Sequence, residues 1–462
     1  MSTTLLAPAQ WAQLQFGSAE LGDQRRTERL VNMATHLAEN PGGTLPQAFD
    51  NWAELKAAYR FLDQPVVAQE QITEPHRQRT RAACCQPGEY LLIEDTSELD
   101  YTGGMGREDL GVIGDGRGRG LMLHTTLAIK VEAWNLEQRP EGVVVGLLAQ
   151  QCWNRRAIPA RKHETRAQLL RRPRESQRWA AVLEQSGSPP QGCTWIYIAD
   201  RESDFYEPIE RCQRHGVDFI IRACQEHRLV GPPAYLSQAL ERAPVRGRME
   251  VQLRSRPGQA ARTAQVEVRT ATVLYRAPYR PGGQGANLPL HVIEVRETDA
   301  PAGSEPLHWI LLTSLSCERW VEVQRIIGRY TARWWVEEYH KALKSGAKVE
   351  ESQLQRAYRL ESLIAILAVV AIRLLNTKHL ARARPDERID PKTFGKEALE
   401  ILAEKFCQPK GGWTNRELIR AVARLGGFIG RRGDGEPGWQ TIWRGWHRLM
   451  YMAQGAELIL NR

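Results

Sequence analysis

YTARWWVEEYHKALK, residues Tyr330–Lys344, is the part of the chain from which the architecture can be worked out. It contains no glycine or proline and several good helix formers, so it predicts one continuous α-helix. At about 100° per residue, one side would carry a carboxylate among cations and aromatic rings: Tyr330, Arg333, Trp334, Glu337, Lys341 and Lys344. The other side would be an apolar stripe that faces the core: Ala332, Trp335, Val336, Tyr339, Ala342 and Leu343.

The mixed face has two interpretations. It is an ordinary solvated surface if Glu337 and Lys341 simply form an i,i+4 ion pair. A second interpretation follows from the spacing Y-x2-R-x3-E-x6-K, formed by Tyr330, Arg333, Glu337 and Lys344. This spacing resembles the signature helix of bacterial DDE transposases of the insertion-sequence-four family, which includes the transposon Tn5 transposase. The resemblance implies two aspartates elsewhere, each at the end of a strand.

Length and charge set broad limits on the fold and its partner. A chain of 462 residues is too long for one compact core and predicts two or three domains. Charged residues make up 25% and hydrophobic residues 42%, as in ordinary soluble proteins. The formal net charge of +9 favours a polyanionic partner such as nucleic acid, although a merely basic soluble protein would show the same excess.

The cysteine pattern and the apolar segments point to a cytoplasmic protein with no membrane partner. The eight cysteines form no C-x2-C pair and have no matching histidine spacing, so we expect reduced thiols and no zinc site. The amino terminus lacks the basic start and apolar run of a signal peptide. The most apolar segment, Leu363–Leu375, is too short to span a bilayer and contains Arg373, which predicts a buried helix.

Residues 1–75 are predicted to be helical, with Asp23 as the N-cap of a helix that carries Arg25, Arg26 and Arg29 on its first turns. Arginines near a helix start commonly contact DNA phosphates and base edges, although a solvated helix face would look similar. The string LGDQRRTERL resembles the family's domain that binds the transposon end.

Two apolar runs end in acidic residues. EYLLIEDTSELDY delivers Asp95 and CTWIYIADRESDF delivers Asp200, as expected of buried strands with carboxylates at their carboxyl ends. Asp200 could instead be the N-cap of the helix that follows it. The strings IEDTS and IADRESD resemble the family's two aspartate motifs, and WILLTS, RLESLIAILAVVAIRLL and ARLGGF extend the match along nearly the whole chain.

The expected fold class is α/β, and the resemblance implies an RNase H-like catalytic core with a β-rich insertion between helical N- and C-terminal domains. The predicted boundaries are 1–75 for the end-binding domain, 76–224 and 306–384 for the two parts of the core, 225–305 for the insertion, and 385–462 for the C-terminal dimerisation domain. Alternating apolar and polar residues support the insertion, and Trp439, Trp443 and Trp446 form an aromatic cluster near the C-terminus.

Asp95, Asp200 and Glu337 are the predicted catalytic residues and metal ligands. In-line attack on a DNA phosphate requires charge to be neutralised on both the attacking and the leaving oxygen, and two Mg²⁺ ions about 3.5–4 Å apart can do this. Carboxylates suit such hard cations. Mn²⁺ is expected to substitute for Mg²⁺.

The resemblance also implies roles for other residues and for partners. Tyr330, Arg333 and Lys344 match positions that bind phosphates around a flipped-out nucleotide, Trp309 matches the aromatic on which that base stacks, and Trp334 matches a second aromatic at the hairpin. It implies cut-and-paste transposition of double-stranded DNA by a homodimer that pairs two inverted-repeat ends, forms hairpins and joins the ends to target DNA. A structure-selective nuclease on the same fold and a non-catalytic DNA-end-binding protein are the alternatives.

Overall fold

The computed structural model describes residues 6–460 except 50, 104–106, 108, 156–174, 176, 226–227, 229, 232–234, 255–260, 281–282, 390–393 and 395. The segment 154–178, whose sequence is dense in arginine, therefore lies mostly outside the described residues. All eight cysteines lie within them, and none forms a disulfide.

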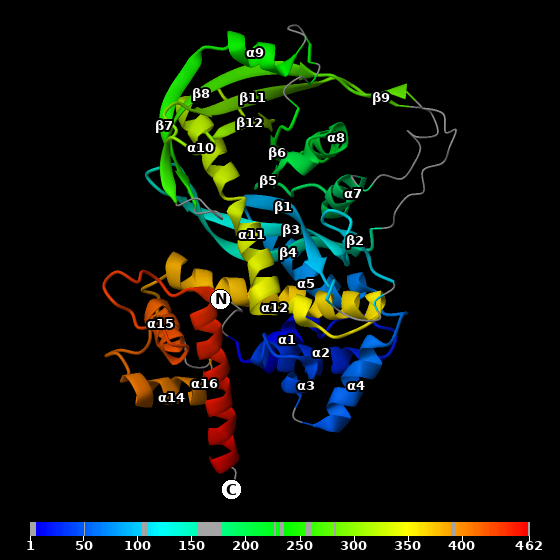
Figure 1. The fold of residues 1–462 in the computed structure, drawn as a ribbon, viewed down its shortest axis with the longest axis vertical. Helices are drawn as coiled ribbons and strands as arrows, with labels where there is room; N and C mark the ends of the chain where they lie inside the picture. Colours follow the sequence, from blue (N-terminus) through cyan, green and yellow to red (C-terminus); the bar gives the residue numbers. More distant parts are fainter. Residues whose placement is uncertain are drawn as a thin grey trace.

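Three groups of elements follow one another along the chain (Figure 1). The first is helical: α1 (Pro8–Phe16), α2 (Gln24–Glu39), α3 (Leu45–Ala48), α4 (Trp52–Leu62) and α5 (Gln69–Cys84). The second is mixed: β1 (Gly88–Asp100), β2 (Gly111–Ile113), β3 (Gly118–Trp134), β4 (Pro140–Trp153), α7 (Gln177–Ser186), β5 (Cys193–Ala199), α8 (Tyr206–His215), β6 (Asp218–Arg222), α9 (Leu236–Arg242), β7 (Val245–Leu253), β8 (Arg262–Tyr275), β9 (Tyr279–Arg280), β10 (Gly283–Gln284), β11 (Leu288–Glu297) and β12 (His308–Thr313). The third is helical again: α10 (Trp320–Thr331), α11 (Trp334–Lys341), α12 (Ala357–Ala383), α14 (Lys396–Phe406), α15 (Asn415–Leu425) and α16 (Trp439–Leu460).

One mixed ten-stranded sheet forms the centre, in the order β2-β3-β1-β5-β6-β12-β11-β8-β7 with β4 paired to β3. Strands β1, β5 and β6 are parallel, and the pairs on either side of them are antiparallel. With helical regions flanking this sheet, the architecture is the expected α/β class and is consistent with an RNase H-like core. The strands of the β-rich segment, β7, β8 and β11, continue the same sheet because β11 pairs with β12.

Strand alternation divides the core between the two faces of the sheet. Leu91 and Ile93 of β1 pack in the cluster that contains α12, whereas Tyr90 and Leu92 pack in the cluster that contains α8 and α9. Because both faces are covered, β1 and β5 are continuous apolar runs rather than alternating ones. Successive side chains point to opposite faces, so Asp95 is expected on the same face as Ile93.

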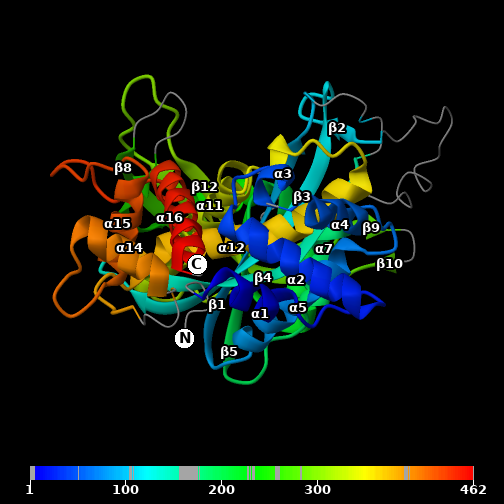
Figure 2. The same ribbon diagram turned by 90° about the horizontal axis from the view of Figure 1, so that it is seen from below.

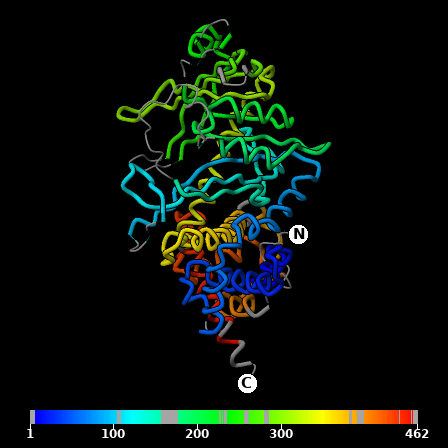
Figure 3. Tube along the Cα trace, turned by 90° about the vertical axis from the view of Figure 1, so that its right-hand side faces the viewer, coloured from blue at the N-terminus to red at the C-terminus, as the bar shows by residue number. Residues whose placement is uncertain are grey.

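Helix α12 lies between the sheet and the two helical ends of the chain (Figures 1 and 3). It packs on β4 and α11 on one side, and on α2, α4, α5 and α15 elsewhere. Seen from below, the N-terminal and C-terminal helices lie side by side beneath it (Figure 2). A window of α12 is long and apolar enough to cross a membrane, but 89% of that window is buried inside the protein, which confirms the predicted core helix.

The predicted continuous helix over Tyr330–Lys344 is wrong. Helix α10 ends at Thr331, α11 begins at Trp334, and a π-helical turn follows at Ala342–Gly346. At the break, the Thr331 hydroxyl donates to the Gly328 carbonyl at 2.7 Å, and the Arg333 amide donates to Tyr330 three residues back. A hydroxyl bonded to the preceding turn and a tightened hydrogen-bond pattern are common causes of a kink.

The break changes which side chains face the core. Tyr330 is buried rather than exposed, and Trp335 is half-buried and stacks on His379 with ring centroids 4.2 Å apart. The rest of the predicted apolar stripe is buried as expected: Ala332, Val336, Tyr339, Ala342 and Leu343. At the N-terminus, the Asp23 side chain caps α2 by accepting from the Arg25 amide, as predicted.

Two glycines allow α15 and α16 to cross closely. A Cβ placed at Gly445 would lie 1.7 Å from the Val422 carbonyl oxygen, and one placed at Gly426 would lie 1.8 Å from the Thr441 carbonyl oxygen. No real Cβ atom tolerates such distances to backbone, so the helices would have to separate.

We therefore expect Gly445→Ala to lower the free energy of unfolding of the C-terminal helices by about 1–3 kcal/mol, the usual cost of overpacking. Gly455→Ala is a matched control on the same helix, since no described atom lies within 4 Å of a Cβ placed there. It should be neutral or stabilising, because alanine favours a helix by about 0.5–1 kcal/mol over glycine. Urea denaturation followed by tryptophan fluorescence compares the two; equal stability of both variants would contradict the close crossing.

Candidate active site

The register of the parallel strands places Asp95 and Asp200 beside each other. Ile93 pairs with Ile198, and each aspartate follows its isoleucine by two residues. Strand β5 ends at Ala199, so Asp200 begins the loop, as expected. Asp95, however, lies inside β1, which continues along β3 to Asp100, where the sequence predicted a strand end. What ends near Asp95 is the pairing with β5, since Ile93 is the last paired residue.

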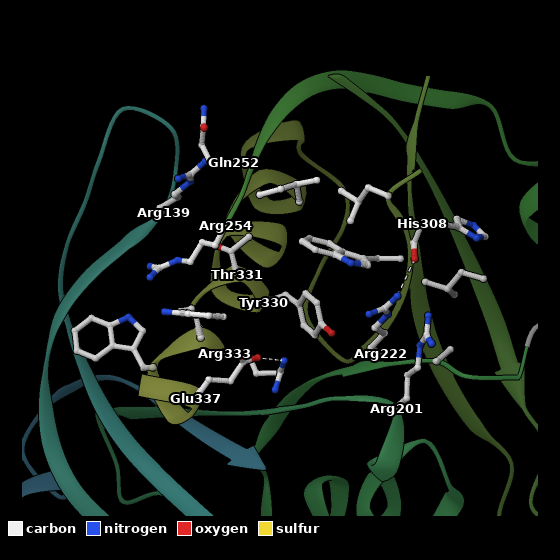
Figure 4. Close-up of a pocket in the computed structure, with 18 of the residues that line it drawn as sticks. Arg139, Arg201, Arg222, Gln252, Arg254, His308, Tyr330, Thr331, Arg333 and Glu337 are labelled. Atoms are coloured by element: carbon white, nitrogen blue, oxygen red, sulfur yellow. Dashed lines mark hydrogen bonds and ion pairs between the residues drawn. The ribbon is translucent and has the colours of Figure 1, made fainter. Parts of the chain in front are cut away.

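Glu337 lies near the two aspartates because its helix, α11, packs on β1. Arg333 connects it to Asp95. One guanidinium nitrogen donates to Glu337 Oε1 (Figure 4), and another lies 3.3 Å from Asp95 Oδ2. Asp200 and Glu337 both lie close enough to Asp95 for their negative charges to raise the pKa of Asp95. The structure thus brings together the three carboxylates predicted from sequence.

Asp95 is more buried than Glu337, with 16% of its side chain exposed against 32% for Glu337. Burial raises the pKa of Asp95 to about 7, Arg333 opposes that rise, and the two neighbouring carboxylates add to it. The imidazole of His340 also lies 3.9 Å from Asp95, but burial lowers its pKa to about 3, so it is neutral and does not offset the negative charge.

The loop after β5 combines capping with structural anchoring. Asp200 accepts a hydrogen bond from the Glu202 amide at 2.9 Å and caps the short turn Arg201–Ser203, so the capping interpretation also holds. Asp204 points away from the carboxylates into the protein, where it pairs with Arg228 at 2.7 Å. Arg228 in turn lies over the ring of Tyr275 on β8, which ties this loop to the outer strands.

A basic pocket of about 530 Å³ opens beside Glu337 (Figure 4). Six arginines from different parts of the chain line it: Arg139, Arg201, Arg222, Arg254, Arg262 and Arg333. Trp309 of β12 lines the pocket and meets Tyr330 edge-on at 5.1 Å, and Trp334 lines it beneath Arg254 at 4.9 Å. Cations and aromatic faces together suit a nucleic-acid strand, because phosphates pair with arginine and bases stack on rings.

Arg222 is the clearest site residue that the sequence analysis missed. It ends β6, whose Ile221 pairs with Ala199, so it stands beside Asp200 at the same sheet edge. Its guanidinium donates to the His308 carbonyl at 3.1 Å and bonds to the Tyr330 side chain. The signal was present in VDFIIR, a third buried strand that ends in a charged residue.

Lys344 lies apart from this pocket in the π-helical turn. Its Nζ donates to the Glu98 carbonyl at 2.5 Å and pairs with Glu350 at 3.4 Å. These contacts hold it near β1, on the Glu98 side of Asp95. Its predicted phosphate contact stays a prediction.

Behind Asp95, on the opposite face of β1, the buried carboxylate of Glu94 bonds to His124 on β3. The other ring nitrogen of His124 lies 2.9 Å from the Thr96 hydroxyl, and the ring packs on Trp179 at 4.7 Å. These contacts fix the strand segment that carries Asp95. Sequence spacing gave no sign of them, because His124 is 30 residues from Glu94.

Arg25, Arg26 and Arg29 are not part of this site. They lie on α2, on the other side of α12 from the sheet (Figure 1). Arg25 is exposed, whereas Arg26 donates to the Leu21 carbonyl at 2.9 Å. The structure therefore separates the predicted end-binding arginines from the predicted catalytic carboxylates.

The three carboxylates offer the hard oxygen donors that Mg²⁺ prefers. Among the described residues, no group of three or more His, Cys, Asp or Glu side chains is arranged to hold a metal ion in this conformation. Arg333 lies between two of the three carboxylates. The donors thus have the right chemistry, and an ion would compete with Arg333 for them.

Removing Arg333 should expose that competition. We expect Arg333→Met to destabilise the metal-free protein by about 1–3 kcal/mol, because two partly buried carboxylates lose their counterion. Saturating Mg²⁺ should restore much of this loss by binding the folded state. Thermal unfolding with EDTA or with Mg²⁺ measures both effects. Arg319→Met, on an exposed i,i+3 pair with Glu322, is the control and should show neither. A loss that Mg²⁺ leaves unchanged would contradict the expected competition.

Two family models match the chain. Residues 8–67, which contain α1 to α4, match a transposase DNA-binding family. Residues 369–460, from within α12 to the end of α16, match a Tn5 transposase dimerisation domain. The first match includes Arg25, Arg26 and Arg29, and the second includes the cluster of Trp439, Trp443 and Trp446.

The sequence between the two matches folds into the mixed sheet that carries the carboxylates and the basic pocket. A match to a transposase DNA-binding family at one end and a match to the Tn5 transposase dimerisation domain at the other flank this core. The two matches together support a Tn5-like transposase.

Proposed function

We propose that this protein is a Tn5-like transposase that works by a cut-and-paste route: it binds transposon ends, cleaves the DNA beside them and joins the freed ends to target DNA. The observation that carries the proposal is the convergence of Asp95, Asp200 and Glu337 around Arg333 at the side of a basic, aromatic-lined pocket. Three carboxylates beside a phosphate would repel it and weaken DNA binding unless metal cations were bound between them. The arrangement therefore favours catalysis over binding alone.

Asp95, Asp200 and Glu337 are proposed to hold two Mg²⁺ ions, with Mn²⁺ as a substitute. Such ions would neutralise charge on the attacking and leaving oxygens of the scissile phosphate. Arg333 is proposed to release at least one carboxylate when they bind. Its guanidinium would then be available to a phosphate oxygen, for which its planar donors are suited.

The strand in the pocket is proposed to pass from a nick to a hairpin. Water first attacks a phosphorus atom, and the freed 3′ hydroxyl then attacks the opposite strand. The second attack requires a sharp bend, which is easier if one base leaves the stack and rests on an aromatic ring. Trp309 and Trp334 supply two such rings within the pocket.

Binding and pairing of the ends are assigned to the flanking helices. Arg25, Arg26 and Arg29 are proposed to contact the inverted repeat, and α16 is proposed to join two subunits. The three tryptophans of α16 are buried within the chain, so they are less suited to this contact than the exposed Tyr451 and Met452 further along the helix.

The decisive experiment incubates the protein with native-end and random-end DNA plus Mg²⁺ and resolves the products on a denaturing gel. A transposase gives end-specific nicks, hairpins and joined products. A structure-selective nuclease on the same fold gives nicks without joining, and a non-catalytic end-binding protein gives neither.

Asp95→Asn should abolish metal-dependent nicking while end binding stays within about twofold of wild type, because it removes a metal ligand without changing side-chain size. Asp299→Asn, on an exposed turn after β11, is the matched control and should cleave normally. Gel shift measures binding, and the denaturing gel measures nicking. Cleavage by Asp95→Asn at the wild-type rate would remove Asp95 from the mechanism.

Metal affinity should depend on the protonation of Asp95. Its pKa of about 7 means that the carboxyl is largely protonated at pH 6 and largely ionised at pH 8. Since a metal requires the ionised form, Mg²⁺ binding should weaken about tenfold per pH unit below 7 and level off above it. Titration calorimetry at several pH values measures this, with proton release on binding near pH 7. A flat profile between pH 6 and 8 would show that Asp95 does not control binding.

A further inference from the structure

The indole ring of Trp334 has polar contacts both on one face and at its edge. The Arg254 guanidinium lies over its ring at 4.9 Å, and its indole Nε1 donates to Glu338 Oε1 at 3.3 Å. The ring is half-buried and lines the basic pocket. A cation over one face and a hydrogen bond at the ring edge together restrict rotation about both side-chain torsions.

Glu338 is fixed by contacts with α12. It faces away from its neighbour Glu337: Glu337 points toward Asp95, and Glu338 is buried toward α12. Its second carboxylate oxygen accepts from Lys378 of α12, and the side chains of Glu338 and Lys378 are only 10% and 6% exposed. Lys378 lowers the pKa of Glu338 despite its burial, so the carboxylate stays ionised.

A buried ion pair is a poor device for joining two helices. Desolvating both charges costs free energy that apolar side chains of similar size would not, and replacement of such pairs by apolar residues is often neutral or stabilising. The Glu338–Lys378 pair nevertheless provides something that an apolar pair cannot, namely an acceptor of fixed position for the indole N–H of Trp334.

The chain of contacts continues into the C-terminal helices. Lys378 lies over the ring of Trp439 at 4.4 Å, and Trp439 stacks on Trp443 with centroids 5.5 Å apart. Both tryptophans belong to α16 and fall inside the match to the dimerisation domain. Three successive contacts, Trp334–Glu338, Glu338–Lys378 and Lys378–Trp439, therefore connect the pocket to the helix assigned to subunit pairing.

We propose that Glu338 is a positioning residue that orients the Trp334 ring for stacking on a displaced base, and that Lys378 and Trp439 hold Glu338 in place. The assignment rests on the proposed function, because it takes the pocket to bind a DNA strand. It adds that the orientation of one stacking ring depends on how α16 is docked.

Two double variants separate positioning from stability. Glu338→Leu with Lys378→Met removes both buried charges and also the acceptor. Glu338→Gln with Lys378→Met removes the same charges but keeps an amide oxygen for the Trp334 indole. Neither leaves a buried charge unpaired, so both are expected to fold, and thermal unfolding checks that they do.

The full-length protein is tested on native-end DNA with Mg²⁺. In the Leu/Met variant we expect the ratio of hairpin to first nick to fall about tenfold, the usual effect of losing one hydrogen bond to a charged group. In the Gln/Met variant the ratio should stay within about threefold of wild type. Equal ratios in the two variants would overturn the positioning role. Glu89→Gln, which breaks a partly buried pair with Arg329, is the control and should change no ratio.

A second readout needs no activity. In protein labelled with 5-fluorotryptophan, the Trp334 resonance is assigned from its loss in Trp334→Phe, and ¹⁹F NMR follows it without DNA. It should shift in the Leu/Met variant and in Trp439→Leu, and stay close to wild type in the Gln/Met variant. An unshifted resonance in Trp439→Leu would overturn the connection to α16. Absence of cleavage by the wild-type protein would instead count against the proposed function, and the NMR result would stand apart from it.

Discussion

The site depends on the register of three parallel strands. The pairs Ile93–Ile198 and Ala199–Ile221 align β1, β5 and β6, so that Asp95, Asp200 and Arg222 stand in a row where the strands cease to pair. All three follow the residues whose side chains face α12. A shift of one residue in either pairing would turn a whole strand over and send its charge to the opposite face.

Part of this arrangement could be predicted from sequence because it depends on local patterns. Buried parallel strands are continuous apolar runs, so YLLI and WIYIA indicated strands, and the acids behind them indicated a site. The Asp23 cap and the apolar face of α2 follow from the same kind of local signal. The mixed sheet and the flanking helices agree with what those patterns predicted. That Asp95, Asp200 and Glu337 lie close together was implied by the family resemblance and not by any local pattern.

The rest could not be predicted because it depends on contacts between distant segments. The break at Thr331 depends on a hydroxyl that bonds backward, in residues whose propensities favour one helix. Arg254, which directly follows β7, reaches Trp334 from the segment predicted as a β-rich insertion, and β7 itself pairs with β8 in the central sheet. Buried partners such as Glu94 with His124 leave no periodic trace.

The charged side chains around the site are arranged so that arginines line the pocket and one of them lies between the carboxylates. Six arginines from different parts of the chain line one pocket, and among them Arg333 bridges two of the predicted metal ligands. An internal cation of this kind keeps a carboxylate cluster compact before any ligand arrives. It also gives the same guanidinium two alternative partners, carboxylate or phosphate, of similar geometry.

Helix α12 packs against all three parts of the protein. Its partners are α2, α4, α5, α11, α15 and β4. Because α12 is packed on several sides, few of its residues face solvent. This accounts for the small and apolar composition of SLIAILAVVAIRLL. The N-terminal and C-terminal helical regions are consequently not independent of each other, because both pack on the same helix. A change in the surface that one region presents to α12 would have to be accommodated by the other region as well.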